Sequence, residues 1–314
     1  MGTHITKEQP AQGDQRMTAA TTADWGEPSC PACASDALRT LYWDPEVLVR
    51  VCRTCQLMSV AYVHGPPDPQ GVFTREYFQR NYLGSRETLA VPLWNEILDA
   101  LEEMVPTKGR LVDVGCGVGT FLLQARRRGW DTWGVDISAD AVALARGRGL
   151  AVEAGRLPQL DWSAGGVDVL TFFESLVYEA DLGGTLQAGQ ALLRNGGVLV
   201  VKANWLTPRS VRLLHLLSGA LARRPYARAT MHISTSGAST SGGRWLFTPE
   251  NMTALLGRFG FAVRQVRLLP LPPPSPGRRL GWLVRRLTAA GSGFIAYAVN
   301  EGPARVGRPL AGRA

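Results

Sequence analysis

A short glycine-rich stretch and the residues after it carry the clearest chemical signal in the chain. They read LVDVGCGVGTF at 111–121 and GVDIS at 134–138. The apolar residues ahead of the loop suit a buried parallel strand, and Gly115, Gly117 and Gly119 would let the loop turn tightly and expose backbone to a ligand. A helix that starts there presents free N–H groups, and Asp136 can accept hydrogen bonds from two ribose hydroxyls. The pattern predicts a nucleoside pocket at the carboxyl edge of a parallel sheet.

The spacing of the glycines separates two kinds of nucleoside cofactor. A dinucleotide fingerprint, G-x-G-x-x-G, would need glycine where this chain has Thr120. The spacing here is G-x-G-x-G, and with the acidic residue that ends the second strand it resembles the class I S-adenosylmethionine (SAM) methyltransferases. A nicotinamide enzyme and a plain strand–turn–helix are the alternatives.

Four cysteines near the N-terminus form a second strong pattern. Cys30, Cys33, Cys52 and Cys55 read C-x2-C, eighteen intervening residues, C-x2-C, a spacing typical of a four-cysteine zinc site. If all four bind, the site is closed and structural, with no open position for catalysis. Two disulfides or four free thiols are the alternatives. The polar N-terminus shows no signal peptide, which favours a reducing cytoplasm and therefore argues against disulfides.

The order of these two signals resembles bacterial methyltransferases that carry an N-terminal zinc ribbon ahead of a class I domain. The resemblance covers about residues 28–300, and weaker echoes are REYFQRNY, NGGVLVVKAN and FTPENMTALLGRFGF. It implies SAM and a structural Zn²⁺ as cofactors. Some of these relatives act on sugars and natural-product intermediates, so the resemblance implies a small-molecule acceptor.

The composition limits the possible partners. With 314 residues the chain can hold one full α/β domain plus a small module, and no apolar run reaches the roughly 18 residues of a membrane span. The net charge is +8, but the arginine pairs are scattered and only three of the 34 basic residues are lysines. Without one basic stripe, a nucleic-acid partner is disfavoured but not ruled out. The sequence gives no indication of oligomeric state.

The chain divides into five segments. They are a disordered tail (1–24), the zinc ribbon (25–63), a linker and helical segment (64–107), a class I methyltransferase domain (108–300) with a lid insertion (204–245), and a second disordered tail (301–314). Within the ribbon, two strands are expected round an Asp44–Pro45 turn. The lid contains an amphipathic stretch and a flexible Ser/Gly/Thr run. We interpret it as covering the acceptor; a surface excursion without a role is the alternative.

Alternating strand and helix patterns predict an α/β fold, a doubly wound, seven-stranded, mostly parallel sheet. Strands are expected near 110–114, 131–135, 150–153, 167–173, 197–203, 261–269 and 293–299. The last two would form an antiparallel pair at the edge. Thr248, Pro249 and Glu250 predict a helix start.

The resemblance also supplies candidate cofactor residues. They are Asp113, Gly115, Cys116, Gly117, Gly119, Asp136, Ile137, Arg156, Leu157, Phe173 and Tyr82. Cys116 is expected to pack near the backbone and not to act as a nucleophile. Arg156 stands where the family often has an Asp for the adenine amino group, and arginine cannot accept that bond. The backbone of Leu157, or packing against Ile137, is expected to replace it.

Four residues are candidates for catalysis, and one of them, His215, is expected to pack within an apolar helix of the lid instead. A hydroxyl or carbon acceptor needs a base, whereas an amine needs only its neutral form. Glu174 ends the fourth strand, Tyr178 follows it, and His232 lies in a polar stretch of the lid and ranks first. The family often has Glu-His where this chain has Val177 and Tyr178, so the family's mechanism does not carry over directly.

Three functions therefore compete. The first is a small-molecule methyltransferase acting on a natural-product or sugar-like intermediate. The second is an RNA methyltransferase that docks through the ribbon and the arginines. The third is a non-catalytic scaffold, which the intact glycine loop and Asp136 argue against.

Overall fold

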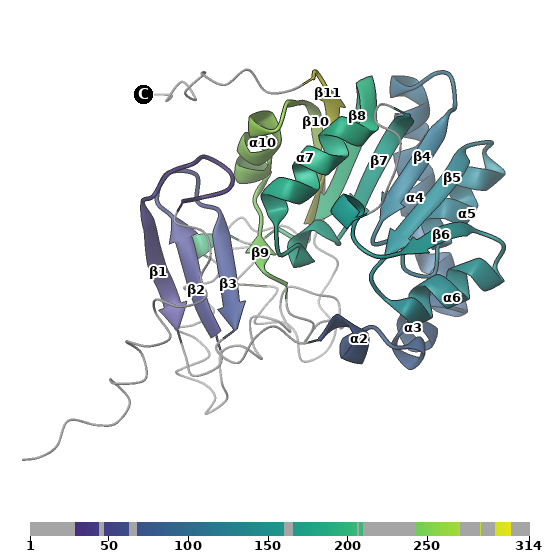
Figure 1. Ribbon diagram of the computed structural model, residues 1–314, viewed down its shortest axis with the longest axis horizontal. Helices are drawn as coiled ribbons and strands as arrows, with labels where there is room; N and C mark the ends of the chain where they lie inside the picture. The colour runs from purple at the N-terminus through teal and green to yellow at the C-terminus, as the bar shows by residue number, and fades with distance from the viewer. Residues whose placement is uncertain are drawn as a thin grey trace, which may run out of the picture.

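Two β-sheets lie side by side, a small one built mainly by the N-terminal residues and a large one built by the rest of the chain (Figure 1). The computed structural model describes residues 29–43, 47–62, 68–159, 166–205, 207–209, 243–270, 283 and 293–302. Among the helices of these residues, none combines the length and the apolar character that a membrane span requires.

The large sheet has seven strands in the order β10-β11-β8-β7-β4-β5-β6. Its strands are β4 (Arg110–Val114), β5 (Asp131–Asp136), β6 (Ala151–Ala154), β7 (Val167–Phe173), β8 (Leu193–Ala203), β10 (Phe261–Leu269) and β11 (Gly293–Asn300). The five strands β4 to β8 are parallel to one another, and β11 runs antiparallel to both β8 and β10. The prediction of a seven-stranded, mostly parallel sheet is confirmed, including the antiparallel pair at the edge.

Helices cover both faces of this sheet (Figure 1). They are α4 (Ser85–Met104), α5 (Thr120–Arg127), α6 (Ala139–Gly147), α7 (Leu182–Leu192) and α10 (Pro249–Arg258). Successive residues of β8 alternate between two cores: Leu199 packs in the core with α7 and α10, and Val200 packs in the core with α4, α5 and α6. This alternation follows from the period of two in a strand. It confirms the doubly wound arrangement.

The small sheet contains the cysteine ribbon. Its strands are β1 (Leu38–Trp43), β2 (Val47–Cys52), β3 (Met58–Tyr62) and β9 (Trp245–Leu246), in that order. β1 and β2 form the antiparallel pair that the sequence predicts, and their connection, 44–46, lies outside the described residues. β3 and β9 were not predicted. β9 follows β8 in the chain, so the ribbon sheet is completed by a strand from the part of the chain that builds the large sheet.

Three contacts hold the ribbon against the large domain. The Trp245 Nε1 donates to the Glu179 backbone oxygen at 2.8 Å. The Arg258 guanidinium donates to the backbone oxygens of Cys30 and Pro31, at 3.1 and 3.3 Å. Cys30 is buried in the same core as α7 and α10. The ribbon is therefore packed as part of one structure with the large sheet.

The segment between the ribbon and α4 crosses the carboxyl edge of the large sheet. It contains α2 (Pro69–Val72) and α3 (Arg75–Tyr82). The Ser138 hydroxyl, at the start of α6, donates to the Phe73 backbone oxygen at 2.6 Å, and the Arg75 N–H donates to the Asp140 carboxylate at 2.9 Å. These two bonds fix α3 beside the end of β5.

Of the expected lid, only the two ends lie in the described part of the chain. Residues 206 and 210–242 fall outside it. Trp205, just after β8, forms a bridge with Phe247, just after β9. The insertion therefore leaves and re-enters the fold at neighbouring points, on the side of the ribbon.

Candidate functional site

The glycine loop joins β4 to α5, as the sequence predicts. Gly115, Gly117 and Gly119 all have positive φ, of 77°, 54° and 75°. A Cβ on Gly115 would lie 2.3 Å from the Ser175 Cβ, and one on Gly119 would lie 2.1 Å from the Leu150 Cδ1. Backbone conformation and packing thus both require glycine at these two positions.

Asp136 braces this loop from the end of β5. One carboxylate oxygen accepts from the Gly117 N–H at 2.7 Å, and the other accepts from the Ser138 N–H at 2.8 Å. The side chain is buried, and burial raises the pKa of its carboxyl although both bonds oppose the rise. Each oxygen keeps a second lone pair for a ligand hydroxyl. The bracing of the loop was not foreseen from the sequence.

The residues at the start of α5 leave polar groups for a ligand. The first N–H groups of a helix have no partner within it. The Thr120 hydroxyl at this position is buried and has no hydrogen-bond partner in the described residues. The site thus combines an unpartnered donor group, a buried acid and a tight glycine loop. This combination suits a nucleoside cofactor whose tail ends in a carboxylate.

Asp113 and Cys116 lie beneath the loop. The Thr171 hydroxyl donates to the Asp113 carboxyl at 2.7 Å. Burial raises the pKa of Asp113 to about 7, and burial also raises the pKa of the Cys116 thiol. A Cβ on Gly134 would lie 2.7 Å from the Cys116 Sγ. Cys116 therefore packs against the backbone of β5 as a neutral thiol, as expected.

Aromatic rings from α3, and from Phe73 two residues before it, lie beside the loop. The Phe78 Cε1 lies 3.5 Å from the Cβ position of Gly117. The Phe73 ring lies 5.3 Å from Tyr77 and 5.7 Å from Tyr178, edge-on to both. Tyr82 is 5.8 Å from Phe78 and is 44% exposed. The sequence singled out the aromatic residues of this segment, with Tyr82 as the cofactor candidate among them, whereas the position of Phe73 carried no specific signal.

Glu174 lies at the open side of this aromatic group. It follows β7 directly, and its φ of 59° is unusual for a residue other than glycine. Its carboxylate forms an ion pair with Lys202 of β8. Burial raises the pKa of the Tyr77 hydroxyl, the hydrogen bond with Tyr82 opposes this, and the charge of Glu174 adds to it. Lys202 was missed, because a lysine inside a strand pattern signals nothing about its partner.

Tyr178 lies in the short helix η2 (Leu176–Tyr178), next to Phe73. Both of the catalytic candidates that the structure describes, Glu174 and Tyr178, are therefore at the same edge as the glycine loop. His232, the first-ranked base, lies outside the described residues.

The remaining cofactor candidates make contacts inside the protein. The Arg156 guanidinium donates to the Glu179 carboxylate at 3.2 Å. The Leu157 side chain is buried in the core with α7. Phe173 packs at 4.9 Å from Trp94 and 4.7 Å from Phe121. Their roles toward a cofactor, like that of Ile137, stay predictions.

The four ribbon cysteines converge. All four Sγ atoms lie within 4.8 Å of one another, with Cys30 and Cys55 at 3.4 Å and Cys33 and Cys52 at 3.6 Å. A tetrahedral zinc with Zn–S bonds of about 2.3 Å sets sulfurs ~3.8 Å apart, whereas a disulfide needs about 2.05 Å. All five cysteines of the chain are free thiols. The cluster therefore has the geometry of a metal site and not of two disulfides.

Comparison with known proteins identifies the family. A family model described as "Methyltransferase domain" matches residues 86–266, more than half of the chain. The chain belongs to this methyltransferase family. Its seven-stranded sheet and glycine loop make it a class I, SAM-dependent enzyme. The methyltransferase match begins in α4 and ends in β10, so it leaves out the ribbon.

Individual relatives of this methyltransferase are distant. A dTDP-3-amino-3,4,6-trideoxy-alpha-D-glucopyranose N,N-dimethyltransferase of Streptomyces venezuelae is 29% identical over 129 residues, which is 40% of this chain and 54% of that protein. The match thus spans about half the length of that relative. A SAM-dependent methyltransferase from Archaeoglobus fulgidus has a TM-score of 0.50 at 16% identity, covering 71% of this chain and 98% of that chain.

A second solved structure has the same TM-score of 0.50 at 18% identity, and the match covers 72% of this chain and 97% of that chain. It comes from the complex between the Haloferax volcanii Trm112 methyltransferase activator and a methyltransferase. At these identities the two structures show a common fold and nothing finer.

The buried Asp113 makes the methyltransferase's stability depend on pH. Its pKa in the folded protein, about 7, is above the ordinary value of an unfolded aspartate, so the folded state holds the proton more tightly. The stability from this group is full at low pH and is lost as pH rises through 7. Between pH 5 and pH 8 we expect a loss on the order of 2 kcal/mol, measured by urea unfolding. In Asp113→Asn the same pH series should be clearly flatter; an unchanged slope would contradict the assignment.

Proposed function

We propose that this methyltransferase moves the methyl group of SAM to a small-molecule acceptor, a natural-product or sugar-like intermediate. The observation that carries the proposal is the group of aromatic rings beside the glycine loop. Rings of Phe73, Tyr77, Tyr82 and Tyr178 contact one another in a chain, and the charge of Glu174 acts on the Tyr77 and Tyr82 hydroxyls. Such a site offers apolar faces and a few polar groups, which is typical of pockets for small molecules. The amino-sugar dimethyltransferase named above supports the sugar-like class.

The proposed roles follow from the contacts. When bound, SAM supplies a methyl group already activated by its sulfonium charge. Asp136 would hold the ribose through its remaining lone pairs, while Gly117 lets the backbone approach closely. Phe78, which lies over Gly117, would exclude water from that contact. The enzyme's main task is to hold the acceptor atom in line for attack.

We propose Glu174 and Tyr178 as the groups that handle the acceptor's proton, with His232 as a third candidate. Glu174 is held in place by Lys202 and by its own backbone N–H, which donates to the Lys202 oxygen at 2.8 Å. A carboxylate that is paired with a lysine on a fixed backbone can accept a proton from a hydroxyl or orient an amine.

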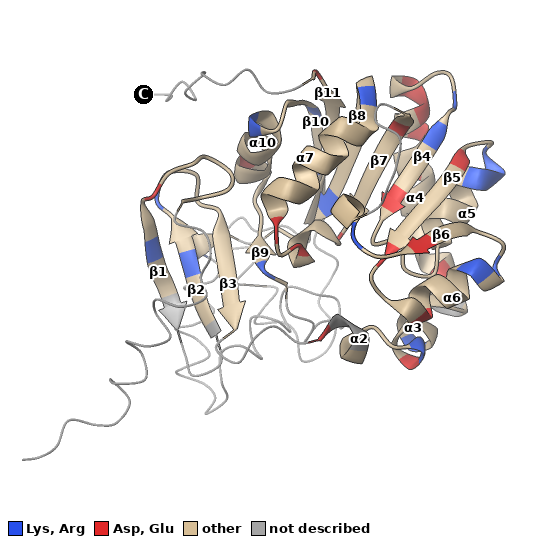
Figure 2. Ribbon diagram, viewed as in Figure 1, with Lys and Arg blue, Asp and Glu red and all other residues tan. Residues whose placement is uncertain are grey.

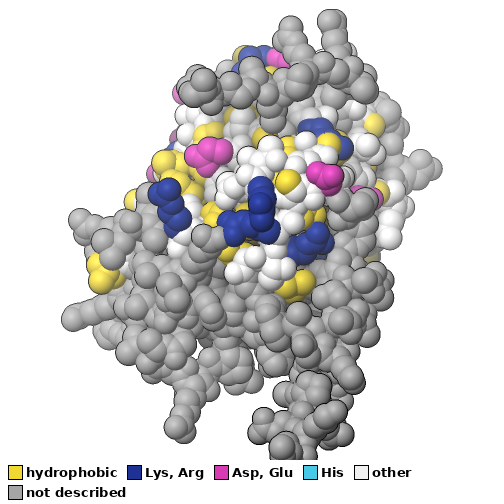
Figure 3. Space-filling view, turned by 90° about the vertical axis from the view of Figure 1, so that its left-hand side faces the viewer, with side chains coloured by type: hydrophobic (Ala, Val, Ile, Leu, Met, Phe, Trp, Pro, Cys, Tyr) yellow, Lys and Arg dark blue, Asp and Glu magenta, His cyan; other side chains and the backbone are white. Residues whose placement is uncertain are grey.

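RNA methylation is the weaker alternative. Seven arginines form ion pairs with nearby acids: Arg110, Arg128, Arg148, Arg156, Arg194, Arg264 and Arg267. Lys and Arg lie beside Asp and Glu over the large sheet and its helices (Figure 2). From the ribbon side, the arginines in view are separated by acidic, apolar and uncharged side chains (Figure 3). Among the residues that the structure describes, this distribution shows no basic stripe of the kind that follows a phosphate backbone.

The first test is transfer of labelled methyl from SAM into a host extract that is then split into small-molecule, RNA and protein fractions. We expect label in the small molecules. Label in RNA, with RNA binding that weakens steeply as salt rises, would replace the proposal by the alternative. SAM binding without label in any fraction of extracts from several growth stages would favour the scaffold hypothesis.

Asp136→Ala should weaken SAM binding by 1.5–3 kcal/mol, on the order of ten- to a hundredfold, because a ribose contact and the brace of Gly117 are both lost. Isothermal titration measures the affinity. Asp131→Ala is the matched control, since Asp131 begins the same strand and its side chain is 57% exposed. Equal SAM affinity in wild type and Asp136→Ala would refute the assignment.

We propose that the cysteine cluster of Cys30, Cys33, Cys52 and Cys55 holds a structural Zn²⁺. Four thiolates that close the coordination sphere leave no position for substrate. Because Cys30 and Cys52 are also buried in the main core, the metal would stabilise the docking of the ribbon as well as the ribbon itself.

Purified protein should therefore contain close to one zinc per chain by elemental analysis, and a strong chelator should lower its melting temperature. Cys55→Ser should lose the metal, while Cys116→Ser, which changes the cysteine in the glycine loop, should keep it. Absence of zinc together with an unchanged melting temperature in chelator would show that the cluster is not a metal site.

A further inference from the structure

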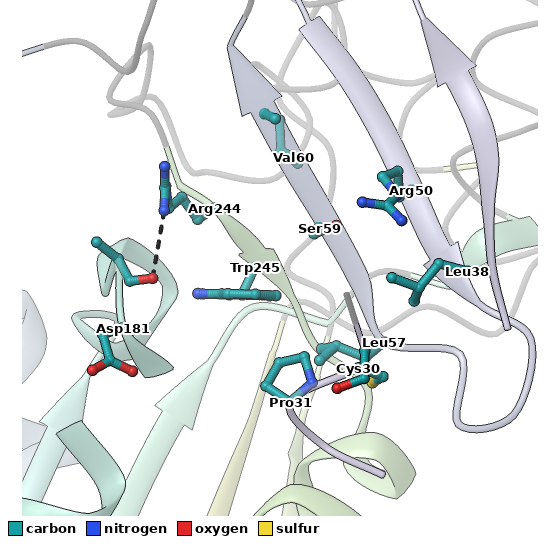
Figure 4. A pocket seen from close by; sticks show the side chains of 13 residues that line it. Cys30, Pro31, Leu38, Arg50, Leu57, Ser59, Val60, Asp181, Arg244 and Trp245 are labelled. Atoms are coloured by element: carbon teal, nitrogen blue, oxygen red, sulfur yellow. Dashed lines mark hydrogen bonds between the residues drawn. The ribbon is translucent and has the colours of Figure 1, made fainter. Parts of the chain in front are cut away.

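A cavity of about 300 Å³ lies between the ribbon and the large domain (Figure 4). Its ribbon wall comes from the first cysteine turn and from the sheet, and its other wall comes from Ala180 and Asp181, just after η2. None of its lining residues belongs to the glycine loop or to α3. It is therefore separate from the cofactor pocket.

One row of side chains crosses the sheet along this cavity. Arg50 of β2 lies opposite Ser59 of β3, and Ser59 lies opposite Trp245 of β9. Residues directly opposite in antiparallel strands share a face, with Cβ atoms about 4.5–5.5 Å apart. Figure 4 shows the Arg50 side chain directed toward Ser59, and Arg244 on the other side of the strand that carries Ser59. An arginine and a hydroxyl thus stand together beside an indole.

The charges of the lining residues do not cancel. Neither Arg50 nor Arg244 forms a salt bridge with any described residue. Arg244 donates to the Ala180 backbone oxygen at 3.4 Å. Asp181, the one acid in the lining, caps α7 by accepting from the Gly184 N–H at 2.8 Å. Two half-buried guanidinium groups without a carboxylate partner favour an anion.

The rest of the lining is apolar except for Ser29, which adds a second hydroxyl. Pro31, Leu38, Leu57, Val60 and Ala61 contribute most of it. The Trp245 N–H is already bonded to the Glu179 oxygen, so the indole adds an apolar surface to the wall. The cavity therefore suits a molecule with one acidic end and a flat or apolar body.

The cavity and the proposed acceptor side share a wall. The Arg244 N–H donates to the Val177 oxygen at 2.7 Å, and the Cβ position of Gly243 lies 3.8 Å from the Tyr178 ring. The Tyr62 hydroxyl of the ribbon donates to the Gly243 oxygen at 3.3 Å. A molecule that extends past Tyr178 away from the glycine loop would reach Arg244 first, and then the row that contains Arg50.

We propose that this cavity binds the acidic end of the methyl acceptor, a phosphate or carboxylate group on an organic body. The proposal rests on the small-molecule function proposed above. It makes the ribbon part of the acceptor site: the ribbon sheet supplies Arg50 and Ser59, and the segment that joins it to the large domain supplies Arg244.

Titration calorimetry on the full-length, metal-containing protein tests the binding. The probes are phenyl phosphate for the phosphate class and benzoate for the carboxylate class, and phenol is the neutral control. At least one acid should bind, and phenol should not bind measurably. Arg50→Gln and Arg244→Gln should each weaken that acid by about tenfold and leave SAM affinity unchanged.

The matched control is Arg39→Gln. Arg39 precedes Thr40, which lies opposite Arg50, so Arg39 is on the other face of the same sheet. It should bind the acids as the wild type does. Equal losses in Arg39→Gln and Arg50→Gln, equal binding of phenol, or no binding of either acid would each overturn the proposal.

The charge of the methylated product tests the link to the acceptor. Labelled small molecules from the extract should be retained on an anion exchanger at neutral pH, and Arg50→Gln should raise KM for that fraction with a smaller change in kcat. Label in neutral or cationic small molecules alone would overturn this inference and leave the small-molecule function standing. If the cavity binds acids but the label appears only in RNA, both the small-molecule function and the role of the cavity in binding the acceptor would be overturned.

Discussion

The arrangement of the site depends on one buried contact, the bond from the Gly117 N–H to the Asp136 carboxylate. It joins the loop after β4 to the end of β5 and fixes the position from which backbone can meet a cofactor. The bond is strong because the acceptor is a carboxylate in a buried position. Around it, Gly115 and Gly119 cannot carry a Cβ without a clash. Loop shape, acid and helix start are therefore a single unit, and replacing one part displaces the others.

Two further parts of the structure are added to this loop and acid, namely the aromatic residues of α3 and the ribbon. The first is the aromatic cover from α3, tied to α6 through Ser138 and the Phe73 oxygen. It closes the side of the cofactor pocket that the parallel sheet leaves open. The second is the ribbon, whose fourth strand, β9, belongs to the end of the insertion after β8. Because residues of the ribbon also pack in the main core, the ribbon is held beside the proposed acceptor side.

The sequence predicted the regular part of this structure well. All seven strands of the large sheet occur where the alternating pattern placed them, and the α10 start is capped by Thr248 and Asn251 as expected of its Thr-Pro-Glu sequence. These features depend on residues near one another in the chain, through periodicity, capping and turn formation. β9 escaped prediction because a strand of two residues, Trp245–Leu246, has no period to detect. Lys202 escaped because its partner, Glu174, is distant in sequence.

By itself, the sequence determined the kind of cofactor loop, the acid that accompanies it, the strands of the large sheet and the paired spacing of the four cysteines, since each is encoded in short spacings or in repeated apolar positions. Only the tertiary structure decided which side chains meet across those elements. It bound Arg156 to Glu179, placed Lys202 against Glu174, and joined the ribbon to the large domain around a cavity with Arg50 and Arg244 in its wall. Contacts of this kind arise from packing between distant segments, and packing leaves no mark in the local order of residues.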